Sequence, residues 1–329
     1  MMYPLKFKPY LCEKVWGGEK IAPFKGIYTT RNRIGESWEI SAVKGHVSVV
    51  QDGPFAGKTL TGLMEERGAE LAGKKVIGKT GTEFPLLIKF IDAKDDLSIQ
   101  VHPTDALAAR TNPGQKGKTE MWYVVGADKG AKLLSGLTQE ITPEEYEEKV
   151  NDNTITDVLG RYDVRPGDVF FLPAGRIHAI GAGSFVAEIQ QTSDITYRIY
   201  DYGRLGLDGR PRELHLEKAK EAIDYTVFPD YRTEYTPVKN EEVSLVKCKY
   251  FTTTIFDLDK PVSKNLSVLD SFVVVICVAG KGVLVDNEGD GSVHKIGLRQ
   301  GETVLVPATS STIEFHPDGA MTCLTSFIE

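Results

Sequence analysis

The sequence predicts a mainly β protein with two sandwich or barrel domains of the jelly-roll type and a few helical insertions. Short alternating or β-branched runs dominate the chain, and glycine, proline and aspartate residues separate them. The length of 329 residues favours about two compact units, because one hydrophobic core seldom grows much larger. The clearest strand runs are HVSVV, LLIKFI, LSIQVH, MWYVV, DVFFLP, FVAEIQ, FVVVICV and ETVLVP.

A weak internal repeat supports the two-domain interpretation. Arg165–Pro173 reads RPGDVFFLP and Arg299–Pro307 reads RQGETVLVP, so both segments place a glycine, an acid, four strand residues and a proline in the same order. The stretch Phe228–Glu242, which is charged and has little periodicity, is the predicted linker. We therefore expect one domain over residues 1–235 and a second over residues 236–329.

Helical periodicity is confined to a few segments. Three of them begin at a threonine or proline that suits the start of a helix. The predicted helices are Thr59–Lys75, Pro103–Arg110, Pro143–Asn151 and Leu214–Asp224.

Composition excludes several classes of protein. Apolar residues make up 41% of the chain, yet no apolar run is long enough to span a bilayer, and the first residues lack the pattern of a signal peptide. The net charge of −7 is spread without a basic block, which argues against a nucleic-acid or anionic-membrane surface. We expect a soluble, cytoplasmic protein with no obligate protein partner.

The cysteines form no CxxC pair and lie far apart in the chain. This spacing suggests neither a thiolate zinc site nor a disulfide framework, so we expect reduced and mostly buried thiols. They are Cys12, Cys248, Cys277 and Cys323.

Polar side chains occupy one face of two predicted strands. Alternation in Asp96–His102 puts Ser98, Gln100 and His102 on the same side. The same alternation groups Lys118, Glu120 and Trp122. A Pro-Ala-Gly turn after the strand that ends at Pro173 can direct His178 back across a barrel mouth. These three segments are predicted to converge.

Two imidazoles, a carboxylate and an amide oxygen make a mixed set that suits zinc, and also Fe(II) or Mn(II). Taken singly, His102 has the ordinary alternative of a hydrogen-bonded loop histidine, and Glu120 that of a solvated strand residue. Their joint order favours a metal site with one open position, which indicates catalysis.

The order and spacing of these residues resemble a known family. Gly167, Asp168, Pro173, Gly175 and His178 reproduce the second motif of the cupin superfamily, whose last histidine is a metal ligand. The first motif departs from the common form, because its usual His-x-His is Gln100-x-His102 and the ligand glutamate follows a helical insertion. Together with GKTEMWYV and ITYRIYDYGR, this pattern is similar to type I phosphomannose isomerases of the short bacterial form, from Trp16 to about Arg204.

The resemblance implies two cupin-type domains and a zinc-dependent aldose–ketose isomerase that interconverts mannose 6-phosphate and fructose 6-phosphate through an enediolate. It implies one Zn²⁺ per chain, with a sugar phosphate as the partner molecule. The implied metal ligands are Gln100, His102, Glu120 and His178. The implied catalytic residues are Arg198, Lys118 and Glu188, and the implied substrate-binding residues are Trp16, Glu36, Lys89 and Ser98.

The chemistry of the individual side chains does not decide several of these roles. Arg198 keeps its proton and therefore suits charge stabilisation, although a structural ion pair is its alternative. Lys89 lies in an apolar run and must either extend its amine to solvent or reach an anion. Lys118 and Glu188 are both candidates for moving protons, and the sequence does not choose between them.

Two other functions compete with this one. A non-catalytic sugar-binding cupin would share the fold, and another metal-dependent cupin enzyme acting on a related sugar phosphate would share much of the site. The carboxy-terminal turn GETVLVPATSSTIEF has no histidine where the first domain has His178. We therefore expect the second domain to have no metal ligands.

Overall fold

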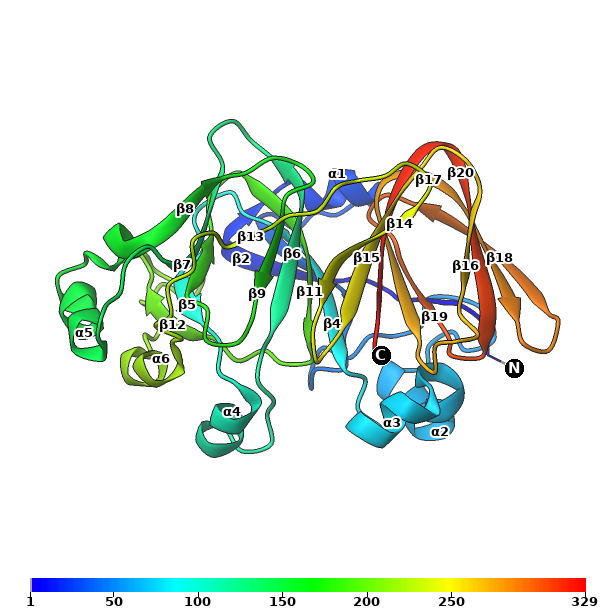
Figure 1. The fold of residues 1–329 in the computed structure, drawn as a ribbon, viewed down its shortest axis with the longest axis horizontal. Helices are drawn as coiled ribbons and strands as arrows, with labels where there is room; N and C mark the ends of the chain where they lie inside the picture. The colour runs from blue at the N-terminus through cyan, green and yellow to red at the C-terminus, as the bar shows by residue number, and fades with distance from the viewer. Residues whose placement is uncertain (1) are drawn as a thin grey trace.

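The computed structural model describes residues 2–329 and contains two β domains that lie side by side. In Figure 1 the strands coloured blue to green form most of the left-hand domain, and those coloured yellow to red form most of the right-hand domain. Among the described residues, no helix has the length and apolar character needed to cross a membrane.

The first domain consists of two antiparallel sheets that face each other. The seven-stranded sheet has the order β13-β9-β6-β11-β4-β3-β2, and the five-stranded sheet has the order β12-β5-β10-β7-β8. The strands of the larger sheet are β2 (Tyr10–Gly18), β3 (Ile34–Ile40), β4 (Leu86–Asp92), β6 (Glu120–Ala127), β9 (Val169–Leu172), β11 (Ser184–Gln191) and β13 (Arg232–Thr233). Those of the smaller sheet are β5 (Ile99–Val101), β7 (Lys132–Leu137), β8 (Leu159–Asp163), β10 (His178–Ile180) and β12 (Tyr197–Tyr200).

The second domain is one eight-stranded sheet. Its two long strands bend, as register shifts around Gly280 show, so that their halves lie on different sides of a barrel. The amino-terminal strand β1 pairs with β19, so the start of the chain joins the carboxy-terminal sheet. The strands are β1 (Leu5–Lys6), β14 (Glu242–Lys247), β15 (Thr252–Leu258), β16 (Val262–Asn265), β17 (Val273–Glu288), β18 (Val293–Arg299), β19 (Thr303–Val306) and β20 (Ser310–Phe327).

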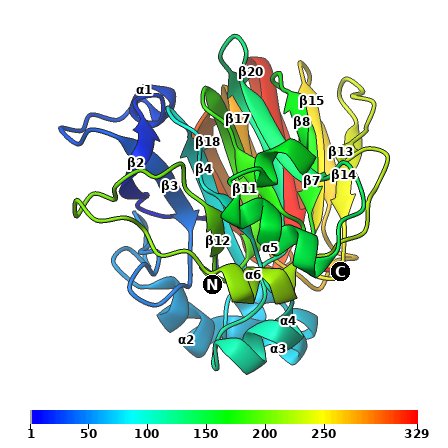
Figure 2. The same ribbon diagram turned by 90° about the vertical axis from the view of Figure 1, so that its left-hand side faces the viewer.

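Helices cover the outside of these sheets. In Figure 2, α5 and α6 lie in front of the five-stranded sheet, and the buried residues Tyr146 and Ala219 pack there with Ile99 and Ile199. In Figure 1, α2 and α3 lie below the second domain. The helices are α1 (Ile21–Lys25), α2 (Leu60–Ala72), α3 (Lys74–Thr80), α4 (Asp105–Thr111), α5 (Pro143–Asn151), the 3₁₀ turn η1 (Ile155–Val158) and α6 (Leu216–Ala222).

Most of the predicted elements are confirmed, but three expectations need correction. The predicted helix Thr59–Lys75 is interrupted twice, because Arg67 has a non-helical backbone within α2 and Gly73, with a φ of 93°, separates α2 from α3. The predicted strand HVSVV forms only isolated bridges at Val49 and Val50. The short helix α1 was not predicted. Of the four cysteines, Cys277 and Cys323 are buried whereas Cys12 and Cys248 are half-buried, and all four are free thiols.

Alternation on the strands determines where the cores and the cavity lie. On β17, Val274 and Ile276 pack into a core shared with the first domain, whereas Val273 and Val275 fill the interior of the second domain. On β4, Ile88 and Phe90 belong to that shared core. The intervening side chain of β4 therefore points into the space between the two sheets of the first domain.

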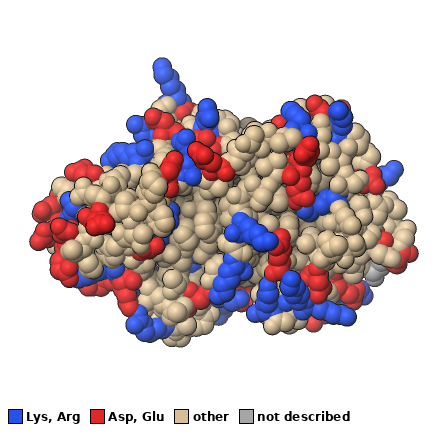
Figure 3. All heavy atoms as spheres, in the orientation of Figure 1, with Lys and Arg blue, Asp and Glu red and all other residues tan. Residues whose placement is uncertain are grey.

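Figure 3 shows that charges of both signs are dispersed over the surface. Acidic side chains gather over α5 at the left-hand end, and basic side chains gather along the lower edge near α2 and α3.

Candidate active site

One row of inward-facing side chains crosses the seven-stranded sheet. Trp38, Lys89, Glu188 and Trp122 are register partners on β3, β4, β11 and β6. Lys89 Nζ lies 3.5 Å from Glu188 Oε1 and 4.7 Å from the centroid of the Trp38 ring. Trp122 Nε1 donates a hydrogen bond of 2.9 Å to Glu188 Oε2. The row fixes Glu188 from both sides.

A second row crosses the five-stranded sheet, which faces the first. His178, Gln100 and Arg198 are register partners on β10, β5 and β12. Their neighbours along the strands, such as Val101 and Ile199, are buried under the helices, so the three polar side chains point the other way, toward the larger sheet. Gln100 Nε2 lies 3.3 Å from His178 Nε2.

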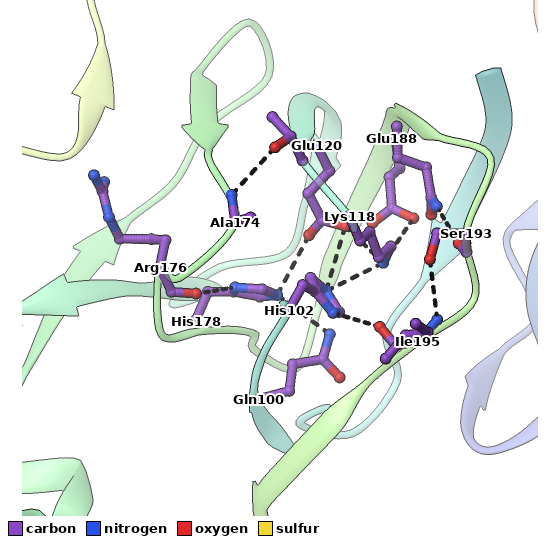
Figure 4. A network of polar contacts seen from close by, with 12 residues as sticks. Gln100, His102, Lys118, Glu120, Ala174, Arg176, His178, Glu188, Ser193 and Ile195 are labelled. Atoms are coloured by element: carbon purple, nitrogen blue, oxygen red, sulfur yellow. Dashed lines mark hydrogen bonds and ion pairs between the residues drawn. The ribbon is translucent and has the colours of Figure 1, made fainter. Parts of the chain in front are cut away.

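Between the two rows, His102, Glu120 and His178 form a buried cluster (Figure 4) whose ligand atoms all lie within 4.8 Å of one another. Glu120 Oε1 is 3.3 Å from His178 Nε2, and Glu120 Oε2 is 3.5 Å from His102 Nε2. Lys118 reaches the same point, with its Nζ atom 2.6 Å from Glu120 Oε2.

Backbone carbonyls orient both imidazoles. Nδ1 of His102 lies 2.8 Å from the oxygen of Ile195, and Nδ1 of His178 lies 2.8 Å from the oxygen of Arg176. With the proton on Nδ1, each ring donates to its carbonyl and presents the lone pair of Nε2 to the cluster. Burial, assisted by the Lys118 charge, lowers the pKa of His102 to about 4, and burial lowers the pKa of His178 as well. Both rings are therefore neutral, which is the form that binds a metal ion.

The Glu120 carboxylate is charged and lacks hydrogen bonds. Burial acts to raise its pKa, but the nearby Lys118 charge outweighs burial and holds the pKa well below its usual value. Neither carboxylate oxygen has a hydrogen-bond partner, because the Lys118 contact is an ion pair without hydrogen-bond geometry. A fully buried carboxylate without hydrogen bonds, facing two imidazole lone pairs, fits a divalent cation.

A cavity of about 290 Å³ opens beside this cluster and is lined by five cationic side chains against three acidic ones. Arg198 projects into the cavity, where its Nε donates to Ser98 Oγ (3.2 Å) and its Nη1 donates to the Glu213 carbonyl (2.9 Å). The cations are Lys14, Lys89, Lys118, Arg198 and Arg212, and the acids are Glu36, Glu188 and Asp194. The excess of positive charge suits an anionic ligand of modest size.

Within the cavity, Lys89 and Glu36 hold each other in the charged state. Burial acts to raise the pKa of Glu36, but Lys89 and Lys14 lower it to about 2. Burial acts to lower the pKa of Lys89, but Glu36 and Glu188 raise it above its usual value. The Lys89 amine therefore lies among buried carboxylates and does not extend to solvent.

Comparison with known proteins identifies the family. Residues 5–121 match the family model "Phosphomannose isomerase type I, catalytic domain", and residues 241–328 match "Mannose-6-phosphate isomerase, cupin domain". Mannose-6-phosphate isomerase ManA of Bacillus subtilis is 35% identical over 332 aligned positions, which cover 99% of both chains. The chain belongs to the type I mannose-6-phosphate isomerase family.

Other members of the mannose-6-phosphate isomerase family agree with this assignment. The mannose-6-phosphate isomerase of Streptococcus mutans is 32% identical and covers 97% of this chain and 96% of its own. The crystal structure of the Bacillus subtilis mannose 6-phosphate isomerase superimposes with a TM-score of 0.87, at 33% identity and 99% coverage of both chains. The predicted resemblance, the predicted cupin fold and the assignment to an isomerase family are thus confirmed.

All of the site residues predicted from the sequence lie together in the first domain. Three of the predicted metal ligands form the cluster and Gln100 lies beside it, and the remaining predicted residues line the cavity: Trp16, Glu36, Lys89, Ser98, Lys118, Glu188 and Arg198. Five further polar residues line the cavity and were not predicted from the sequence: Lys14, Asp194, Thr196, Arg212 and His215. Only Lys14 carried a usable signal, because it stands two residues from Trp16 on the same strand and therefore shares its face.

Proposed function

We propose that this chain interconverts D-mannose 6-phosphate and D-fructose 6-phosphate, with one zinc ion held in the first domain. The observation that carries the proposal is the buried cluster of His102, Glu120 and His178 beside a cation-lined cavity, in a chain of the mannose-6-phosphate isomerase family. A sugar phosphate supplies the anion that this cavity suits.

Gln100, His102, Glu120 and His178 are the proposed zinc ligands. Turning the Gln100 amide by half a turn would present its oxygen in place of the nitrogen that now lies near His178. Imidazole, carboxylate and amide ligands suit zinc, with room for a substrate oxygen. When bound, zinc polarises the sugar oxygens and stabilises negative charge that develops on them.

The reaction removes a proton from carbon beside a carbonyl and returns it to the neighbouring carbon, so the site needs a group that exchanges protons. Lys118 and Glu188 are the proposed groups, and their charged atoms lie 3.9 Å apart. Glu188 Oε1 is buried without a hydrogen-bond partner, which leaves it free to accept a proton. Lys118 lies next to Glu120 and would act nearest to the metal.

Arg198 is the proposed stabiliser of the enediolate. Its guanidinium enters the cavity from the strand next to Gln100, and burial lowers its pKa without removing its charge at neutral pH. The same residue holds Ser98 by a hydrogen bond, so the two can orient a sugar hydroxyl together. Trp16, Glu36 and Lys89 are proposed to shape and charge the rest of the substrate pocket.

A coupled assay with mannose 6-phosphate, before and after chelation and after zinc is restored, tests the proposal. We expect turnover that disappears on chelation and returns with zinc. A second arm uses unphosphorylated mannose, for which kcat/KM should be far lower because the cavity cations have no phosphate to bind. Affinity for the sugar phosphate without turnover would indicate a binding protein and overturn the proposal.

A further inference from the structure

A second cluster of potential metal ligands lies in the carboxy-terminal barrel. Asp286 and Glu288 stand on the same face of β17, and His294 on β18 is the direct register partner of Asp286. One ligand atom from each residue lies within 4.8 Å of the others. The set combines one imidazole with two carboxylates.

The side chains of this cluster lack partners inside the protein. Asp286 is fully buried, and neither of its carboxylate oxygens has a hydrogen-bond partner. Glu288 is 5% exposed, and its Oε1 atom is likewise unpaired. Nε2 of His294 is buried without a partner as well.

A fourth polar group points to the same place from a third strand. Ser310 on β20 is the register partner of Glu288, and its hydroxyl is buried without an aligned hydrogen bond. Burial raises the pKa of the Asp286 carboxyl, and this hydroxyl, which lies beside the carboxyl, opposes that rise. Carboxylate, imidazole and hydroxyl donors from three strands therefore converge on a single point.

The cluster also lacks a compensating charge. In residues 2–329, neither Asp286 nor Glu288 forms an ion pair with a lysine or arginine within 4.0 Å, whereas Glu120 in the first domain has Lys118. Two buried carboxylates without a cation are strongly unfavourable unless a proton or a metal ion neutralises them. A divalent cation would neutralise both and would also satisfy the unpaired imidazole nitrogen.

We propose that Asp286, Glu288 and His294 hold a second divalent metal ion of the zinc or manganese class, which fastens the end of the β17–β18 hairpin to β20. Mixed carboxylate and imidazole ligands suit such ions. The proposed site departs from the sequence-based expectation that the second domain has no metal ligands. It is separate from the proposed catalytic zinc and does not rest on the proposed reaction.

Metal stoichiometry tests this site. The full chain is saturated with Zn²⁺, or in a parallel arm with Mn²⁺, freed of unbound ion by gel filtration, and analysed by mass spectrometry. Wild-type protein should retain two ions per chain in at least one arm, and Asp286→Asn/Glu288→Gln should retain one with its isomerase activity unchanged. His102→Ala/His178→Ala should also retain one, at the second site.

His316→Ala is the matched control, because His316 pairs with Glu314 at 2.9 Å on the same barrel but its side chain is 42% exposed. This variant should retain two ions. If the double carboxylate variant fails to fold, anomalous diffraction from wild-type crystals at the metal absorption edge replaces it, and should give a peak among the three side chains. One ion per wild-type chain, or no such peak, would overturn the proposal and leave a proton shared between Asp286 and Glu288.

Discussion

The two barrels share a turn whose geometry is nearly identical. In the first, Gly167 has a φ of 95° and the Asp168 carboxylate accepts a hydrogen bond of 3.1 Å from the backbone of Arg165. In the second, Gly301 has a φ of 80° and the Glu302 carboxylate accepts one of 3.0 Å from the backbone of Arg299. The weak sequence repeat is therefore one structural unit used twice.

The position of Glu120, a proposed metal ligand, differs between the same two barrels. Glu120 pairs with Leu172, the fifth residue after Gly167, and Val273 pairs with Val306, the fifth residue after Gly301. Val273 thus occupies the place of Glu120, and it is fully buried in an apolar core. The turn and the strands suffice for the fold, whereas the proposed ligand is needed only for chemistry, and the second barrel keeps the fold with an apolar residue in its place.

The largest expected effect comes from removing an imidazole of the first barrel. His102→Ala or His178→Ala should abolish turnover and the metal of that barrel, because a lost ligand reshapes the whole site. Activity and first-barrel metal content measure the effect. Normal turnover in either variant would contradict the ligand assignment.

Placing the carboxylate of the first barrel into the second should destabilise the protein. Val273→Glu buries a carboxylate that has no neighbouring cation to pair with, which should lower the free energy of unfolding by about 3–5 kcal/mol. Chemical denaturation measures the loss. Val293→Glu on the same barrel is the control, because Val293 is 55% exposed and a charge there should change stability by about 0.5 kcal/mol or less. Equal losses of unfolding free energy in the two variants would show that the second barrel tolerates a buried carboxylate at position 273.

Arg198→Ala should lower kcat by roughly 10²- to 10³-fold, equivalent to about 3–4 kcal/mol, if its charge acts in the transition state. The backbone of Arg198 keeps both hydrogen bonds to His215 in this variant, so the fold and the metal content should persist. Arg198→Lys should recover only part of the rate, because lysine offers a point charge instead of a planar fork of donors. An early melting transition in proportion to lost activity would mark Arg198 as structural.

The sequence predicted most of the strands and the convergence of the first-site residues, for a physical reason. Alternation along a strand is enough to place Gln100 and His102 on one face, and the family resemblance selects those residues. The cavity residues Asp194 and His215 were missed because loops carry no periodicity that shows where their side chains point. The second cluster was missed because Asp286 and Glu288 precede a Gly-Asp-Gly turn, a context typical of exposed residues.

The smallest expected effect is a difference in stability between alanine variants at the two copies of the shared turn. Both glycines have a left-handed φ, so alanine should cost about 1–2 kcal/mol at either position. An added methyl group at Gly167 would meet only the Tyr235 hydroxyl at 3.5 Å, whereas at Gly301 it would lie 3.0 Å from the Cα atom of Lys25. Gly301→Ala should therefore be the more destabilising, because the neighbouring backbone must move as well. Denaturation midpoints of the two variants measure the difference, and a larger loss for Gly167→Ala would show that contacts outside the turn decide its stability.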